Sequence, residues 1–133
     1  MPTEPTRSPH QTIRVEGMYA PSGYAHAMLA GRTLYLAGQV ARDEHGTLIG
    51  PGDVEVQGRV VYAHVGRILA AAGARPHDVV KVTTYLADAV DARAAADARL
   101  AFFGEHRPPH TGLVVGLGEG VRLEAEVIAV LAP

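Results

Sequence analysis

The last apolar segment of the chain, VRLEAEVIAVL at residues 121–131, restricts the possible folds more than any other part of the sequence. Its odd-numbered positions are all apolar: Val121, Leu123, Ala125, Val127, Ala129 and Leu131. Its even-numbered positions carry three charged side chains and then two apolar ones: Arg122, Glu124, Glu126, Ile128 and Val130. This alternation predicts a β-strand with one buried face and one half-polar face.

Two strands and a helix are predicted in the first half of the chain. The stretches at 24–31 and 32–40 indicate a hairpin that turns at Ala30-Gly31. Asp53 has the side chain of a helix N-cap, and Gly73 has the conformational freedom needed just after a helix. Between them, apolar residues recur at helical spacing: Val61, Val65, Ile68, Leu69 and Ala72.

The second half predicts a strand, a helix and two further strands. The β-branched stretch at 78–88 indicates a central strand. A second helix is expected to begin at Asp88 or Asp91 and to end at Gly104. Its predicted apolar face consists of Val90, Ala94, Ala98, Ala101 and Phe102. The stretch at 111–117 predicts a strand that a turn at Gly118-Glu119-Gly120 joins to the last one.

The element order β-β-α-β-α-β-β, with a short edge strand at 12–15, predicts one α+β domain over residues 12–133. Residues 1–11 are polar and proline-rich, and we expect them to be loose. We predict a mixed sheet with both helices on one face. Two helices leave the other face uncovered, and that face is too apolar to remain in water. A closed homo-oligomer is therefore expected.

Composition argues against several classes of protein. The chain has no cysteine, so disulfides and thiolate metal sites are excluded. Its net charge of -2 and the lack of a basic stripe argue against nucleic acid as the main partner. No apolar stretch approaches the ~20 residues of a membrane span, and the first residues do not have the apolar centre of a signal peptide. We expect a cytoplasmic protein.

Three groups of residues are candidates for a chemical site. His106 and His110 have metal-like spacing, but the proline pair between them prevents the helix that would align them, so a zinc site is disfavoured. The glycines at 116–120 precede a strand, not a helix, which disfavours a dinucleotide site. Glu124 is a stronger candidate, because burial of a carboxylate at a subunit interface costs free energy unless the group is paired or takes part in catalysis. Two interpretations stay open: a catalytic carboxylate, or a structural pairing of Glu124 or Glu126 with an arginine such as Arg122.

Six separated stretches form a larger pattern: GYAHAM, LYLAGQV, GDVEVQ, ILAAAGARPHDVVKVTTYLAD, AFFGEH and RLEAEVIAV. In order and spacing they resemble the Rid (reactive intermediate deaminase, or YjgF) family over residues 23–130. The resemblance implies a chorismate-mutase-like α+β fold and a homotrimer whose sheets form a central barrel, with three ligand clefts between subunits. It also implies hydrolysis of reactive enamines and imines, such as 2-aminoacrylate, to 2-keto acids and ammonia without a cofactor.

The resemblance also implies roles for individual positions. Glu124 matches the glutamate that holds the attacking water, and Tyr24 matches an early pocket tyrosine. His110 stands where the family has the arginine that grips the substrate carboxylate, so His110 and Glu124 are expected to form two sides of one inter-subunit pocket. The other matched positions are Ala37, Gly38 and Gln39 in place of Ser-Gly-Gln, then Thr111, Gly112 and Ala96.

Histidine in place of arginine alters the expected chemistry. Arginine is always charged and binds a carboxylate through two hydrogen bonds, whereas histidine has an ordinary pKa of ~6.5. The resemblance, with this substitution, therefore implies an imine or enamine hydrolase with altered substrate preference, in which Glu124 would orient water and His110 would bind or protonate the substrate. The alternative is a non-catalytic trimer that binds a small metabolite in the same cleft. Ribonuclease activity, also attached to the family, is a third choice because no basic groove is predicted.

Overall fold

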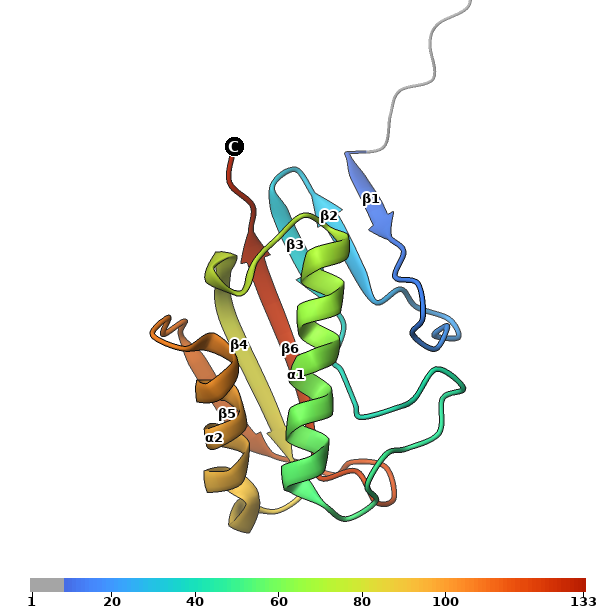
Figure 1. The fold of residues 1–133 in the computed structure, drawn as a ribbon, viewed down its shortest axis with the longest axis vertical. Coiled ribbons are helices and arrows are strands. Elements are labelled where there is room, and N and C mark those ends of the chain that lie inside the picture. Colours follow the sequence, from blue (N-terminus) through green and yellow to red (C-terminus); the bar gives the residue numbers. More distant parts are fainter. Residues whose placement is uncertain (1–8) are drawn as a thin grey trace, which may run out of the picture.

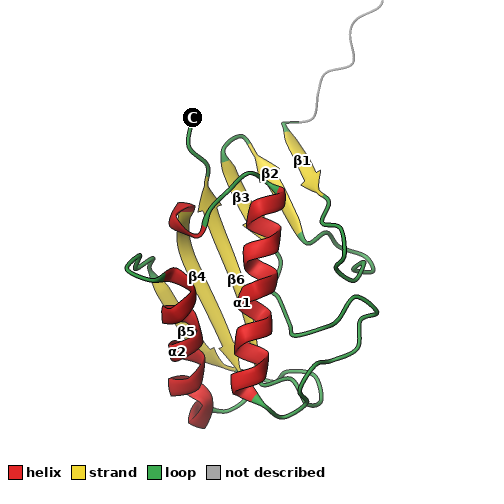
Figure 2. Cartoon of the chain, in the orientation of Figure 1, coloured by secondary structure: helices red, strands yellow, loops and turns green. Residues whose placement is uncertain are grey.

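The structure, a computed structural model, describes residues 9–133 as a six-stranded mixed sheet with two helices packed on one face (Figures 1 and 2). The strands lie in the order β1-β2-β3-β6-β4-β5. Their bounds are His10–Ile13 for β1, Ala27–Ala30 for β2, Thr33–Leu36 for β3, Val79–Leu86 for β4, His110–Val114 for β5 and Leu123–Val130 for β6. The helices are α1 (Val54–Ala71) and α2 (Ala92–Phe103). The predicted α+β class and the mixed sheet are confirmed.

The edge strand β1 begins earlier than the sequence predicted. It pairs antiparallel with β2 from His10 onward, whereas the prediction placed the strand at 12–15. His10 and Gln11 therefore belong to the sheet. The prediction that residues 1–11 are loose is wrong for these two residues. Residues 1–8 of that segment lie outside the described part of the chain.

Helix α1 has the predicted ends. The Asp53 carboxylate accepts a hydrogen bond from the Val56 backbone N–H at 3.1 Å, and Gly73 has a φ of +77° directly after the C-terminal turn. The predicted apolar stripe is buried against the sheet: Val61, Val65, Ile68 and Leu69. The core therefore lies between α1, α2 and the central strands. Within residues 9–133, no helix is long and apolar enough to cross a membrane.

The buried face of helix α2 agrees only in part with the predicted one, since Ala98 and Phe102 pack against the core as predicted. A 3-10 turn at Ala89–Asp91 precedes it, and the Asp88 carboxylate accepts from the Val90 N–H at 2.9 Å. The buried residues of α2 are Ala95 and Phe103. By contrast, Val90 is 76% exposed, although it was expected on the apolar face.

Contact with α1 explains the orientation of α2. A Cβ added at Gly58 would lie 2.9 Å from the Ala98 Cβ, and one at Gly66 would lie 3.2 Å from Phe102 Cε2. These two glycines of α1 let α2 approach closely, so Ala98 and Phe102 face the neighbouring helix. Ala101, predicted on the same face, is exposed.

The last two strands are not a hairpin, which corrects the predicted connection. β5 pairs in parallel with β4, and β6 pairs antiparallel with β4 on its other side. β4 therefore lies between β5 and β6, and the glycine-rich segment at 115–122 crosses the end of the sheet. Alternation of apolar residues predicted that β5 and β6 are strands, but it contains no information about which strand pairs with which.

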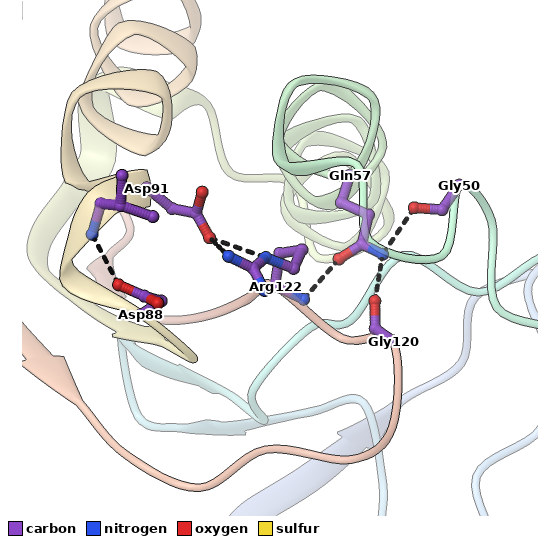
Figure 3. Close-up of polar contacts among 7 residues, drawn as sticks. Gly50, Gln57, Asp88, Asp91, Gly120 and Arg122 are labelled. Carbon is purple, nitrogen blue, oxygen red and sulfur yellow. Dashed lines mark hydrogen bonds and ion pairs between the residues drawn. The ribbon is translucent and has the colours of Figure 1, made fainter.

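A buried polar network holds this crossing segment in place (Figure 3). The Gln57 side-chain amide donates to the carbonyl oxygens of Gly50 and Gly120, each at 2.9 Å. Its amide oxygen accepts from the Arg122 backbone N–H at 2.8 Å. The Arg122 guanidinium donates to the Asp91 carboxylate at 2.7 Å, which ties the start of β6 to the start of α2.

Replacement of Gln57 by leucine is expected to lower the free energy of unfolding by about 1–3 kcal/mol, because it leaves the Arg122 backbone N–H without its acceptor. The Gly50 and Gly120 carbonyl groups each lose one of two hydrogen bonds and keep the one from the Asp53 or Gly52 N–H. Denaturant unfolding at matched protein concentration measures the change. Arg59→Gln, at an exposed position on the same helix, serves as a control with an expected change within about 0.5 kcal/mol. Equal stability of Gln57→Leu and the wild type would contradict the role of the network.

Candidate functional site

The two faces of β6 differ as the sequence predicted. Leu123, Ala125, Val127 and Ala129 are buried on the helix side. Glu124, Glu126 and Ile128 are half-buried on the opposite face, which we call the open face. Large apolar or aromatic side chains on that face remain exposed to solvent: Tyr35, Leu113 and Val130. In a single chain this face lacks a covering layer (Figure 1).

Glu124 lies against a glycine on the segment that follows β3. Backbone hydrogen bonds join Gln39 and Ala125 in both directions, at 2.8 and 3.2 Å. This isolated bridge lays Gly38 directly over the Glu124 side chain. A Cβ at Gly38 would lie 2.8 Å from Glu124 Cδ and 3.0 Å from Cγ, so any larger residue would displace the carboxylate. Ala37 is fixed beside them, because its N–H donates to the His26 carbonyl at 2.8 Å.

Two tyrosines lie on the same side of the site as Glu124. The hydroxyl oxygens of Tyr19 and Tyr24 are 3.4 Å apart. Burial and the contact with Tyr24 raise the pKa of Tyr19, the negative charge of Glu124 acts in the same direction, and the positive charge of Arg42 opposes it. Tyr24, predicted as a site residue, therefore contacts Tyr19, which lies close enough to Glu124 for the carboxylate charge to act on its hydroxyl. Sequence reasoning missed Tyr19, whose only signal was a second tyrosine in the same loop.

The Glu124 carboxylate is half-buried and lacks an ion-pair partner within the described chain. Burial and the nearby charge of Glu126 raise its pKa, while the charge of Arg42 lowers it. Arg122 pairs with Asp91, so the predicted pairing of Glu124 with Arg122 is wrong. Glu126 accepts a hydrogen bond from the Tyr85 hydroxyl, which raises the pKa of that tyrosine. Glu124 is therefore the member of this acidic pair that remains available for chemistry.

His110 lines a separate cavity between β5 and α2 of about 330 Å³. Its Nε2 atom lies 2.9 Å from Arg99 Nη1 and 3.0 Å from Thr84 Oγ1. Burial, then the charges of Arg99 and Lys81, lower the pKa of His110. Gly112 and Ala96 also line this cavity, so three of the predicted positions meet there. Sequence reasoning missed Arg99.

Strand register places Glu124 and His110 on opposite faces of the sheet. Glu124 is paired with Tyr85 of β4, whereas His110 contacts Thr84, the adjacent residue. Successive residues of a strand point to opposite faces. Thr111 is on the open face, where its hydroxyl accepts from the Lys81 ammonium at 2.7 Å. One chain therefore contains two half-sites, and a pocket shared by Glu124 and His110 requires two copies.

The second histidine of the predicted pair serves a different purpose. His106 Nε2 donates to the Val79 carbonyl at 2.7 Å, and its ring lies 4.8 Å from the His77 ring. His106 is thus bound to the start of β4, while His110 turns toward α2. Within residues 9–133, no group of three or more histidine, aspartate or glutamate side chains is arranged to hold a metal ion.

Comparison with known proteins gives one consistent result. The sequence model of the family described as Endoribonuclease L-PSP matches residues 16–131. A 2-iminobutanoate/2-iminopropanoate deaminase from Capra hircus is 36% identical over 111 residues, which cover 83% of this chain and 81% of that protein.

Solved structures show the same fold. A protein of unknown function of the conserved Rid protein family, YyfA from Yersinia pestis, has a TM-score of 0.86 and 25% identity, and the match covers 92% of this chain and 99% of that one. TdcF from E. coli with bound serine has a TM-score of 0.83 and 28% identity, with the same coverage. The fold implied by the sequence resemblance is therefore confirmed.

The pKa of the Glu124 carboxyl is expected to lie above its ordinary value of 4.5. Glu126→Gln should lower the pKa of Glu124 because it removes a negative neighbour, and Arg42→Gln should raise it because it removes an opposing positive charge. A ¹³C NMR titration of the carboxyl carbon measures both changes. Glu55→Gln, on the exposed side of α1, is the control and should have no effect. A Glu124 pKa below 4.5 would be inconsistent with the site as described.

Proposed function

Because the chain belongs to the Endoribonuclease L-PSP family, which includes the Rid proteins, we propose that it is a Rid-type hydrolase of small imines or enamines. The single observation that carries the proposal is the Glu124 carboxylate, half-buried, unpaired within the described chain and pressed against Gly38. The names of its relatives support the same reaction, since one is a 2-iminobutanoate/2-iminopropanoate deaminase. We place this activity in the cytoplasm, as expected from the sequence.

The chemistry requires one carboxylate and one water molecule. Water adds to the carbon of the C=N bond, and Glu124 accepts a proton from that water as its oxygen attacks. The electron pair of the C=N bond goes to nitrogen, which takes the proton that Glu124 accepted. In the resulting carbinolamine, a second proton passes from the hydroxyl group to nitrogen by way of Glu124. The C–N bond then breaks and ammonia leaves, so imine and water become ketone and ammonia. Because the pKa of Glu124 is raised, its carboxylate is a stronger base than that of an exposed glutamate and accepts the proton of the attacking water more readily.

The two half-sites support a closed assembly as part of the proposal. Glu124 is on the open face, and the His110 cavity is on the helix side of the edge strand β5. A neighbouring copy that covers the apolar part of the open face would bring its own β5 edge to the Glu124 of the first. We propose a homotrimer in which Glu124 of one subunit and His110 of the next form each pocket, with the open faces enclosed in a central barrel.

Glu124→Gln is expected to reduce ammonia release from freshly generated imines by at least about 100-fold, because the amide cannot accept the proton of the attacking water. A coupled ammonia assay, with the imine supplied by an amino-acid oxidase, measures the rate. Glu55→Gln should retain the wild-type rate. If wild-type protein bound keto acids saturably but released ammonia from none of the imines, the protein would be a metabolite-binding trimer and the proposal would be wrong.

Mixed assemblies test whether the site is shared between subunits. Gly112→Leu places a side chain in the His110 cavity, and Glu124→Gln removes the carboxylate, so each variant alone should be inactive. Trimers that contain both variants, isolated through two different affinity tags, should regain about one third of the wild-type rate, because one of three junctions then joins two intact halves. No recovery in doubly tagged trimers would show that the two half-sites do not cooperate.

A further inference from the structure

The cavity between β5 and α2 contains a positive charge and has no negative charge in its wall. None of its lining residues is aspartate or glutamate, and Arg99 is the one lining residue with a permanent positive charge. The rest of the wall is mostly small and apolar: Leu86, Ala89, Ala92, Ala95, Ala96 and Val114. A charge beside apolar walls is poorly screened, so its attraction for an anion is stronger than at an open surface.

Arg99 differs from the arginines near it in lacking a carboxylate partner. Arg93 pairs with Asp97 at 3.2 Å, and Arg122 pairs with Asp91. Within residues 9–133, no aspartate or glutamate oxygen lies within ion-pair distance of Arg99, whose side chain instead contacts His110. A guanidinium has five N–H donors, and one contact leaves the others available to a ligand.

The contact between Arg99 and His110 fixes the state of the imidazole. A guanidinium can only donate, so Nε2 of His110 must be the acceptor and the ring hydrogen must be on Nδ1. The lowered pKa of His110 agrees with this neutral form. The charges that act on His110 are those of Arg99, which contacts it from α2, and of Lys81, which lies on the opposite face of the sheet, and both are positive. His110 therefore positions the guanidinium and adds no second charge.

We propose that Arg99 binds the carboxylate of the substrate, and that the substrate is a small aliphatic carboxylate whose chain packs against the alanines of the cavity. This deepens the proposed function and rests on it, because it assigns the binding group of the same site. His110, at the position where the family has its arginine, becomes a positioning residue. A planar guanidinium with free donors matches a carboxylate through two parallel hydrogen bonds. The cavity of about 330 Å³ has the size of a small-ligand site.

Equilibrium binding of a matched pair of ligands tests this assignment without turnover. The pair is 2-oxobutanoate and its neutral primary amide, which have the same size and differ in charge at one group. Wild-type protein should bind the acid at least about tenfold more tightly than the amide, because only the acid forms charge-assisted bonds with Arg99. Arg99→Gln should abolish this preference, and Arg99→Lys should retain part of it.

Arg93→Gln is the matched control, since it removes an arginine from the same helix at an exposed position that is paired with Asp97. It should keep the full preference for the acid. Addition of His110→Arg to the Arg99→Gln variant should restore the preference, because it returns a guanidinium to the same cavity. An unchanged preference in Arg99→Gln, or no restoration in the double variant, would overturn the proposal.

The same variants separate failure of this inference from failure of the proposed reaction. If Arg99→Gln abolishes the preference for the acid but the wild type releases no ammonia from imines, the assignment of Arg99 is supported and the proposed hydrolase activity is wrong. If imines are hydrolysed at a rate that depends on Glu124 and Arg99→Gln changes neither KM nor acid binding, the hydrolase activity is supported and the assignment of Arg99 is wrong. When both proposals are right, Arg99→Gln raises KM for acidic imines, while kcat changes less.

Discussion

The two-residue period of β4, β5 and β6 governs the whole site. Because neighbouring residues of a strand point to opposite faces, Glu124 lies on the open face and His110 on the helix face, although their strands both pair with β4. A single chain therefore presents a carboxylate without a substrate cavity and a cavity without a carboxylate. In the proposed mechanism, assembly is then required to complete the site, and it would also cover the apolar surface.

Burial drives the two titratable groups of the site toward their neutral forms. It raises the pKa of Glu124 and lowers that of His110, in each case as the largest cause. Arg99 is different, since a guanidinium remains charged at every relevant pH. The site thus combines a base of increased strength, a neutral imidazole and one permanent cation. That combination suits a reaction in which a proton moves at one end of the substrate while a fixed charge holds the other.

The sequence predicted those features that depend on local pattern. The Asp53 cap, the α1 stripe, the Gly73 terminus and the two faces of β6 are all set by spacing within a single element, and all were confirmed. The errors concern relations between elements. Alanines occur on every side of α2, so its sequence pattern does not identify the buried face. The close approach at the glycines of α1 determines which face is buried. Likewise, alternation could not show that β4 lies between β5 and β6.

The same difference between local pattern and relations between elements applies to the candidate site. The resemblance assigned Glu124, Gly38 and His110 to the site, and the structure brings Gly38 into contact with Glu124. The roles of Glu124 and His110 in catalysis and binding stay predictions. Two further residues could not be found from pattern alone. Tyr19 is placed by the loop before β2, and the position of the long Arg99 side chain depends on how α2 packs beside β5.

In the proposed site, one face of α2 sets both the size and the charge of the ligand. Ala92, Ala95, Ala96 and Arg99 recur at intervals of three and four residues, which places them on one side of the helix, and all four line the cavity. The alanines decide how large an apolar chain fits, and the arginine decides the charge of the group that is held. A guanidinium on the helix can replace one on the edge strand because His110 accepts its N–H and turns it toward the cavity. If Arg99 binds the substrate as proposed, substrate preference in this chain is determined by α2 together with β5.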